Sequence, residues 1–93
     1  MEFREAANKI YVVNDSGETI GTASLSFPKP DIFTIDSVVV VEAARGRGLA
    51  AKLVELSVIR AIREEKKIVP VCSYAVAQFE KRTDYQLVEA AHL

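Results

Sequence analysis

The sequence predicts an α+β (α/β) fold, in which a mixed central sheet of about five strands packs against one long helix and one short C-terminal helix. Two observations predict it. Short β-branched runs alternate with clusters of turn-forming residues, and one of these runs leads directly into a long stretch of helical periodicity. A chain of 93 residues is too short for a second domain, so we expect one domain over residues 1–93.

The N-terminal half is predicted to form an antiparallel hairpin followed by the central strand. Residues 10–13 are apolar and β-favouring, and the turn formers after them predict a reversal into a second strand over residues 19–27. We expect Pro28 and Pro30 to end that strand, because proline cannot donate to a ladder. Residues 32–41 begin with alternation and end as a continuous β-branched run, which is typical of a strand that is covered on both faces.

The C-terminal half is predicted to contain both helices. Apolar residues recur every three or four positions over residues 45–66, which predicts one long amphipathic helix. Residues 68–71 follow as a short strand, and a right-handed crossover makes it parallel to the central strand. We expect a shorter helix over residues 73–82 and a final edge strand over residues 84–88.

Composition excludes several classes of function. The net charge of −1 argues against a general nucleic-acid binder, which usually carries a strong basic excess. No secretory signal and no apolar run of about 18 residues is present, so we expect no membrane association and a cytoplasmic protein. Cys72 is the single cysteine and forms no intramolecular disulfide. His92 is the single histidine and lies two residues from the end, so we expect neither a metal site nor a catalytic role for it.

The turn between the central strand and the long helix predicts an anion site. Backbone N–H groups at a helix start carry partial positive charge, and glycine lets a phosphate approach them closely. We expect the amides of residues 46–51 to face a diphosphate, with added charge from three basic side chains. The residues of this expected site are Arg45, Gly46, Arg47, Gly48, Leu49, Ala50, Ala51 and Lys52.

Other interpretations of this turn are weaker. A Walker-type loop needs a Gly-Lys-Ser/Thr sequence that is absent here. The spacing of Gly46, Gly48 and Ala51 formally satisfies the dinucleotide fingerprint, but the chain is too short for the repeated units, and no acidic residue ends the next strand. An ordinary helix start, whose glycines only ease a tight turn, is the remaining alternative.

The pattern Arg45-x-x-Gly48-x-Ala50 resembles the motif by which acetyltransferases of the GCN5-related (GNAT) superfamily hold the pyrophosphate of acetyl-CoA. From Ile35 to Tyr85 the chain is similar to the very short members of this superfamily, which lack its usual first helices. The resemblance implies a minimal GNAT fold and acetyl-CoA (coenzyme A) as the cofactor. These short proteins usually carry a cysteine at the place of Cys72. They commonly have a histidine where Ser37 stands, directly after an acidic residue that is Asp36 here.

The resemblance also implies where the thioester arm lies. It would enter the gap where the two parallel strands separate, pair with backbone groups of Val38, Val39 and Val40, and end near Cys72. An N–H of Val39 or Val40 would polarise the thioester carbonyl. Four residues are candidates for the chemistry. Cys72 would be an acid, an acyl carrier or a packing residue, and Tyr74 would be a proton donor or a packing residue. Asp36 would be an amine-binding carboxylate or an ordinary ion-pair partner, and Ser37 is no base unaided.

The resulting hypothesis is an acetyl-CoA-dependent N-acetyltransferase that acts on a primary amine in a ternary complex. The acceptor is a small amine or a peptide or protein lysine. A non-catalytic CoA or acyl-CoA binding module is the alternative, favoured by Ser37 and by Phe79, which stands where larger relatives have a tyrosine. A third hypothesis is a structural or regulatory protein that uses an exposed sheet edge, and we expect a monomer or a weak homodimer.

Overall fold

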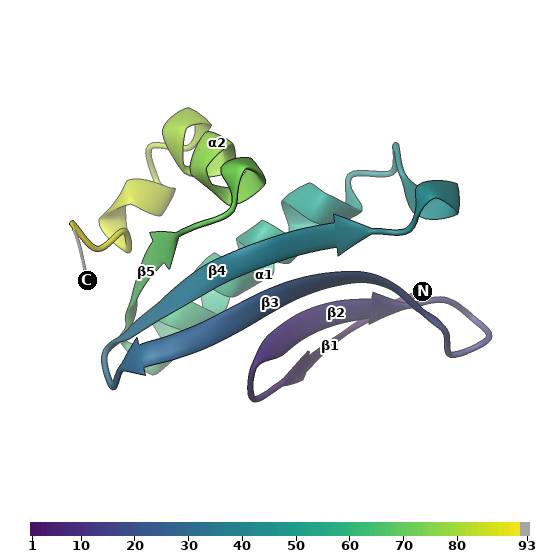
Figure 1. The fold of residues 1–93 in the computed structure, drawn as a ribbon, viewed down its shortest axis with the longest axis horizontal. Helices are drawn as coiled ribbons and strands as arrows, with labels where there is room; N and C mark the ends of the chain where they lie inside the picture. The colour runs from purple at the N-terminus through teal and green to yellow at the C-terminus, as the bar shows by residue number, and fades with distance from the viewer. Residues whose placement is uncertain (92–93) are drawn as a thin grey trace.

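The computed structural model describes residues 1–91 and contains one mixed five-stranded sheet (Figure 1). The strands lie in sequence order, β1 to β4 are antiparallel, and β5 runs parallel to β4. Their bounds are β1 (Glu2–Ala6), β2 (Lys9–Val13), β3 (Thr19–Lys29), β4 (Ile32–Val40) and β5 (Lys67–Pro70). The α+β class, the mixed sheet and the position of β4 beside β5 confirm the predicted architecture. His92 lies outside the described residues.

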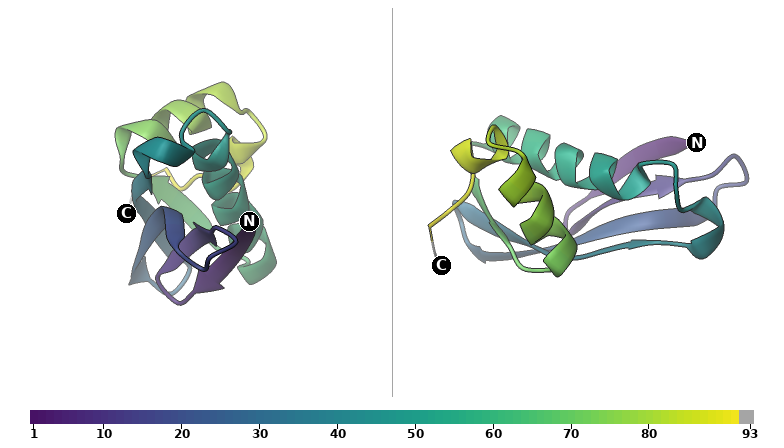
Figure 2. Two further views of the ribbon diagram at one scale, coloured as in Figure 1. Left: turned by 90° about the vertical axis from the view of Figure 1, so that its right-hand side faces the viewer. Right: turned by 90° about the horizontal axis from the view of Figure 1, so that it is seen from above.

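Two α-helices and two short 3-10 turns complete the fold. They are η1 (Glu42–Ala44), α1 (Leu49–Glu64), α2 (Ser73–Lys81) and η2 (Tyr85–Leu87). The long helix α1 lies along one face of the sheet, whereas α2 lies beside the end where β4 and β5 meet (Figures 1 and 2). No helix within residues 1–91 covers the opposite face of β1 to β4 (Figure 2). None of the helices in this part of the chain is long and apolar enough to cross a membrane.

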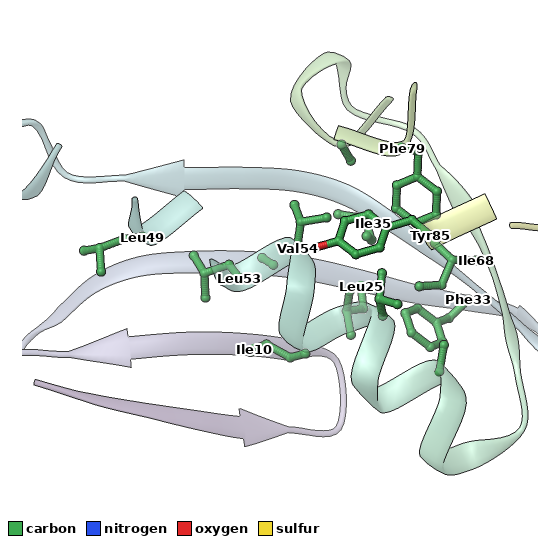
Figure 3. Packing of buried hydrophobic residues seen from close by; sticks show 14 of the residues in the cluster. Ile10, Leu25, Phe33, Ile35, Leu49, Leu53, Val54, Ile68, Phe79 and Tyr85 are labelled. Carbon is green, nitrogen blue, oxygen red and sulfur yellow. The ribbon is translucent and has the colours of Figure 1, made fainter. Parts of the chain in front are cut away.

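The core lies between α1 and the sheet and extends under α2 (Figure 3). Ile10, Ala23 and Ile35 point from neighbouring strands toward Leu53 and Val54 of α1, and all five side chains are buried. Burying each larger apolar side chain stabilises the fold by roughly 1.5–3 kcal/mol. The apolar stripe of α1 is therefore what holds the helix, and with it the preceding turn, against the end of β4.

Two boundaries differ from the sequence-based prediction. The long helix begins at Leu49 rather than at residue 45, because Gly46 and Gly48 have left-handed backbone angles (φ 83° and 75°) that a helix cannot contain. It ends at Glu64, since Glu65 is also left-handed (φ 56°). The strand β3 runs through Pro28 to Lys29. The β3–β4 register is irregular between Ser26 and Lys29, so no ladder hydrogen bond there requires the N–H group that Pro28 lacks.

The predicted strand over residues 84–88 is wrong, and β1 was not predicted. Residues 85–87 form η2, which buries Tyr85 against α2, and only Glu89 makes an isolated parallel bridge to Ile68 of β5. The fifth strand of the sheet is instead β1, which pairs with β2 over its whole length. The strand count was right, but one of its members was misassigned.

Candidate functional site

The glycine turn leaves a row of backbone N–H groups without acceptors. Gly48 is the N-cap of α1, and no side chain caps this helix start. The first helical hydrogen bond runs from Lys52 N–H to the Gly48 carbonyl at 3.1 Å, whereas the amides of residues 46–51 donate to no other described residue. Unbonded N–H groups at a helix start form a site for an anion. Free N–H groups are what the expected phosphate site requires, and that site stays a prediction.

A cavity of about 230 Å³ lies directly at this turn. It is formed by the end of β4, the turn itself, the first turn of α1 and one aromatic side chain of α2. Its lining residues are Val40, Ala44, Arg45, Gly46, Gly48, Leu49, Ala50, Ala51 and Tyr74. Only Ala44 was not among the predicted site residues, because a buried alanine in a short 3-10 turn carries no signal in the sequence.

The three basic side chains near the turn are placed differently. Arg45 lines the cavity, and its Nε donates to the Val40 carbonyl at 3.0 Å, which anchors the guanidinium at the end of β4. Lys52 makes an ion pair with Glu55 at 2.7 Å, so its charge is partly balanced. Arg47 is exposed and does not line the cavity. Arg45 is therefore the cation best placed to meet an anionic ligand.

Beyond Ile35, the strands β4 and β5 separate. β5 pairs only with residues 32–35 of β4, and the N–H groups of Val71 and Cys72 both donate to the Ile35 carbonyl, at 3.1 and 3.2 Å. The β3–β4 register advances there by one extra residue, Asp36, which forms a bulge in β4. The edge of β4 that faces β5 is consequently unpaired from Ser37 to Val40.

Strand alternation shows which backbone groups face this free edge. Val41 N–H donates to the Ile20 carbonyl of β3 at 2.9 Å, so the backbone groups of Val39 also face β3, and those of Val38 and Val40 point to the free edge. The Val40 carbonyl already accepts from Arg45. Of the two N–H groups expected to polarise a carbonyl, that of Val40 is therefore available and that of Val39 is not. The Val39 side chain is 59% exposed on the face without a helix.

Cys72 and Tyr74 lie at the start of α2, next to the gap. Cys72 is half-buried and is the N-cap of α2, where its Sγ accepts from Ala75 N–H at 3.4 Å. Tyr74 lines the cavity, and burial raises the pKa of its hydroxyl, which stays protonated at neutral pH. The structure thus brings Tyr74 to the cavity and Cys72 to the point where β4 and β5 separate.

Asp36 and Ser37 lie on the other face of the sheet. The Asp36 carboxylate is exposed and accepts hydrogen bonds from the hydroxyls of Ser26 and Thr34, the latter at 2.5 Å. Ser37 pairs with Ser24, on the same helix-free face. Neither residue lines the cavity. They flank the separated strands from the opposite side, which is where a second reactant could approach. Residues 1–91 contain no cluster of three potential metal ligands.

The arrangement as a whole, a glycine turn after a bulged strand that parts from its parallel neighbour, agrees with a match to a known family. The family model described as GCN5-related N-acetyl-transferase matches residues 9–88. The chain belongs to the GCN5-related N-acetyltransferases. The short GNAT protein expected from the glycine motif is thereby confirmed.

Solved GNAT structures have the same fold. An NMR structure of a GCN5-like putative N-acetyltransferase from Staphylococcus aureus superposes with a TM-score of 0.77 at 28% identity, over 99% of this chain and 89% of that one. A GNAT family acetyltransferase from Elizabethkingia anophelis with acetyl-CoA bound gives 0.62 at 18% identity, over 83% and 51%. N-acetylglutamate synthase from Neisseria gonorrhoeae, complexed with coenzyme A and N-acetyl-glutamate, gives 0.65 at 19% identity, over 82% and 18%. No curated protein is similar enough in sequence to count as a relative.

Proposed function

We propose that this protein is an acetyl-CoA-dependent N-acetyltransferase that transfers acetyl to a primary amine. The observation that carries the proposal is the alignment of two unbonded rows of backbone N–H groups, one at the start of α1 and one on the free edge of β4, around a single cavity. The first row suits a pyrophosphate and the second suits an amide-bearing arm. Two of the GNAT structures with this fold are complexes with coenzyme A or acetyl-CoA.

In this proposal the chain holds the cofactor mainly through its backbone. The amides of residues 46–51 and the Arg45 guanidinium bind the pyrophosphate, and Val38 and Val40 pair with the arm along the unpaired edge of β4. Charge-assisted hydrogen bonds from N–H groups to phosphate are about twice as strong as neutral ones. Lys52 contributes less than Arg45, since Glu55 balances its charge.

The chemistry requires few side chains. The thioester would supply the acyl group: the amine nitrogen bonds to its carbonyl carbon, the C–S bond breaks with its electron pair leaving on sulfur, and the nitrogen gives its proton to water. The Val40 N–H stabilises the negative charge that develops on the carbonyl oxygen. The hydroxyl of Tyr74 or the thiol of Cys72 donates a proton to the leaving thiolate. Asp36 attracts the amine from the helix-free face of the sheet.

A non-catalytic CoA-binding module is the second candidate, and specific observations favour it. The Asp36 carboxylate is already engaged by Ser26 and Thr34, and Ser37 supplies no base. Phe79 is 2% exposed in the core and has no proton to donate. Binding without turnover is the property that separates this candidate from the enzyme.

Calorimetry and a thiol-release assay together test the proposal. We expect CoA and acetyl-CoA to bind with micromolar affinity, and we expect acetyl-CoA to release thiol when a primary amine or a lysine peptide is added. Tight binding with no turnover across a panel of amines would support the binding module. No heat at high micromolar ligand would exclude both CoA hypotheses and leave the structural or regulatory role.

Three further properties belong to the same proposal. Because no helix in the described part of the chain covers the far face of the sheet, the acceptor site is shallow and open, which suits a lysine of a peptide or protein. β1 is an edge strand, so we infer a monomer or a weak homodimer through that edge. A single free cysteine is consistent with action in the reducing cytoplasm.

A further inference from the structure

Tyr85 is a buried tyrosine that the proposed mechanism does not use. It lies in η2, is 3% exposed, and its ring packs against Phe79 with centroids 5.4 Å apart. The Arg82 guanidinium lies over the Tyr85 ring, 4.5 Å from its centroid. These contacts fix the ring, so the direction of its hydroxyl is fixed as well.

The Tyr85 hydroxyl points away from Phe79 and toward α1. In Figure 3 its oxygen lies beside Val54, on the side that leads to Leu49 at the start of the helix. The electrostatics agree with this position: burial raises the pKa of Tyr85, and the α1 charges of Glu55 and Lys52 are among those that modify it. The picture and the electrostatics thus both place the hydroxyl near the first two turns of α1.

Within residues 1–91, the hydroxyl has no hydrogen-bond partner. Every polar side-chain atom that is fully enclosed in this part of the chain does have one. The Tyr85 oxygen is consequently not fully enclosed: the ring is buried, but its tip keeps some accessible surface. A buried tyrosine usually finds a partner for its hydroxyl, so this one is open to a partner from outside the chain.

The Tyr85 hydroxyl and the cavity of the candidate site lie along the same helix, α1. Ala50 and Ala51 of α1 line that cavity, and Val54 follows Ala50 by about one helical turn, or roughly 5 Å. Tyr74 brings α2 to the same cavity from the other side. Tyr85 itself does not line the cavity, but its hydroxyl lies about one helical turn along α1 from residues that do.

We propose that Tyr85 is a ligand-contacting residue whose hydroxyl donates a hydrogen bond to the arm of bound coenzyme A that follows the pyrophosphate. The proposal rests on the proposed function. The arm carries amide carbonyls and a terminal sulfur, all of which accept hydrogen bonds. Tyr85 therefore selects ligands that possess this arm over nucleotides that end at the phosphates.

The test compares CoA with adenosine 3′,5′-bisphosphate, which lacks the arm. Tyr85→Phe removes only the hydroxyl and keeps the ring packing. We expect it to weaken CoA binding about three- to tenfold, the usual effect of one hydrogen bond, and to leave adenosine 3′,5′-bisphosphate binding unchanged. The control is Tyr11→Phe, because Tyr11 lies on β2 opposite Arg4, on the sheet face away from α1. It should change neither affinity.

Equal CoA affinity in wild type and Tyr85→Phe would overturn the proposal, as would an equal loss for both ligands, which would show a general structural effect. Contacts between the Tyr85 ring protons and the CoA arm, measured by NMR on the wild-type complex, provide a second readout, and their absence would also overturn it. A wild-type protein that binds no CoA refutes the proposed function itself. The two failures are therefore distinguishable.

Discussion

Backbone conformation, rather than lack of room, makes Gly46 and Gly48 necessary. A Cβ at either position would have no neighbour within 4 Å, but both residues have the left-handed φ that other residues rarely adopt. Gly17, in the β2–β3 turn, shares both properties. The open space around Gly46 and Gly48 is the cavity itself, which is where a phosphate would approach.

The glycine turn gives a test with a matched control. Gly46→Ala and Gly48→Ala each place a methyl group in the cavity, so we expect CoA affinity to fall about tenfold, equivalent to ~1.4 kcal/mol. Gly17→Ala carries the same backbone strain, about 1 kcal/mol of stability, far from the site. Calorimetric titration of all three variants checks this. Equal CoA affinity in the three proteins would refute the assignment of the turn.

Cys72 combines a structural role with a proposed chemical one. Because Sγ caps α2, Cys72→Ala should cost about 1 kcal/mol of stability, whereas Cys72→Ser keeps an acceptor and should cost less. We expect both variants to lower kcat in the thiol-release assay without changing CoA affinity. Mass spectrometry after incubation with acetyl-CoA would show an acetyl adduct if the thiol carries the group. Full activity in Cys72→Ser would leave Cys72 with the capping role alone.

At this scale, the sequence predicted which residues surround the cavity better than it predicted their orientation. Motif spacing grouped Arg45 with the glycine turn, and both line the cavity, because residues close in sequence lie close in space. The bulge at Asp36 decides whether the N–H and C=O groups of Val39 face β3 or the free edge. A bulge cannot be predicted from the local sequence pattern, so this orientation was not predicted. The position of Tyr85 depends on how η2 packs under α2, which is a tertiary contact.

Among the elements, β1 is held to α1 by two arginines that perform different tasks. Arg60 is 7% exposed and donates to the carbonyls of Ala6 and Ala7, at 2.8 and 2.9 Å. Arg63 is exposed and makes a two-point ion pair with Glu5. The buried arginine satisfies the carbonyls of the β1–β2 turn, so it carries more of the stability.

Arg60→Gln should therefore destabilise the protein more than Arg63→Gln. Loss of the buried hydrogen bonds leaves carbonyls of Ala6 and Ala7 without donors, which we expect to cost about 1–3 kcal/mol in urea unfolding at neutral pH. Arg63→Gln removes a solvent-exposed pair and should have only a small effect. Similar stability for the two variants would show that β1 is held by its strand pairing alone.

Acid should abolish the contribution of the exposed pair. Hydrogen bonds from Arg63 lower the pKa of Glu5 in the folded protein. A carboxylate whose folded pKa is depressed stabilises the fold above its unfolded pKa, and this stability is lost as pH falls through the folded value. The difference between wild type and Arg63→Gln should thus be present at neutral pH and disappear as acid protonates Glu5 below its lowered folded pKa, as measured by urea unfolding. A difference that persists in acid would contradict this account.

Element prediction succeeded where apolar residues repeat with a clear period. The apolar stripe of α1 and the β-branched run of β4 were both clear enough for the two elements to be predicted. The expected coverage of β4 on both faces was wrong, because the Val39 side chain is 59% exposed on the face away from α1. The strand β1 was missed because Glu2, Arg4 and Glu5 surround a single large apolar residue, Phe3, as suits an edge strand. Residues 84–88 were misassigned because Tyr85, Leu87 and Val88 also suit a strand, whereas the structure buries only Tyr85 and Val88 among them, three residues apart, as a 3-10 turn does.

For the molecule as a whole, the decisive property is that no helix of the described residues 1–91 covers one face of the sheet. The cavity opens beside α1 and α2, whereas Asp36, Ser37 and the exposed Val39 side chain lie on the bare face. Cofactor and acceptor would therefore approach the separated strands from opposite sides. The sequence predicted a small single domain, but the side of the sheet on which each group lies follows only from the three-dimensional structure.

The central claim is that the turn before α1 and the free edge of β4 form one coenzyme A site. Titration of the isotopically labelled protein with CoA, followed by amide NMR, tests this claim most directly. The account predicts that the amide signals of residues 46–51, Val38 and Val40 shift together with one dissociation constant, while those of Gly17 and β1 do not move. Shifts confined to other regions, or no shifts at high micromolar CoA, would contradict it.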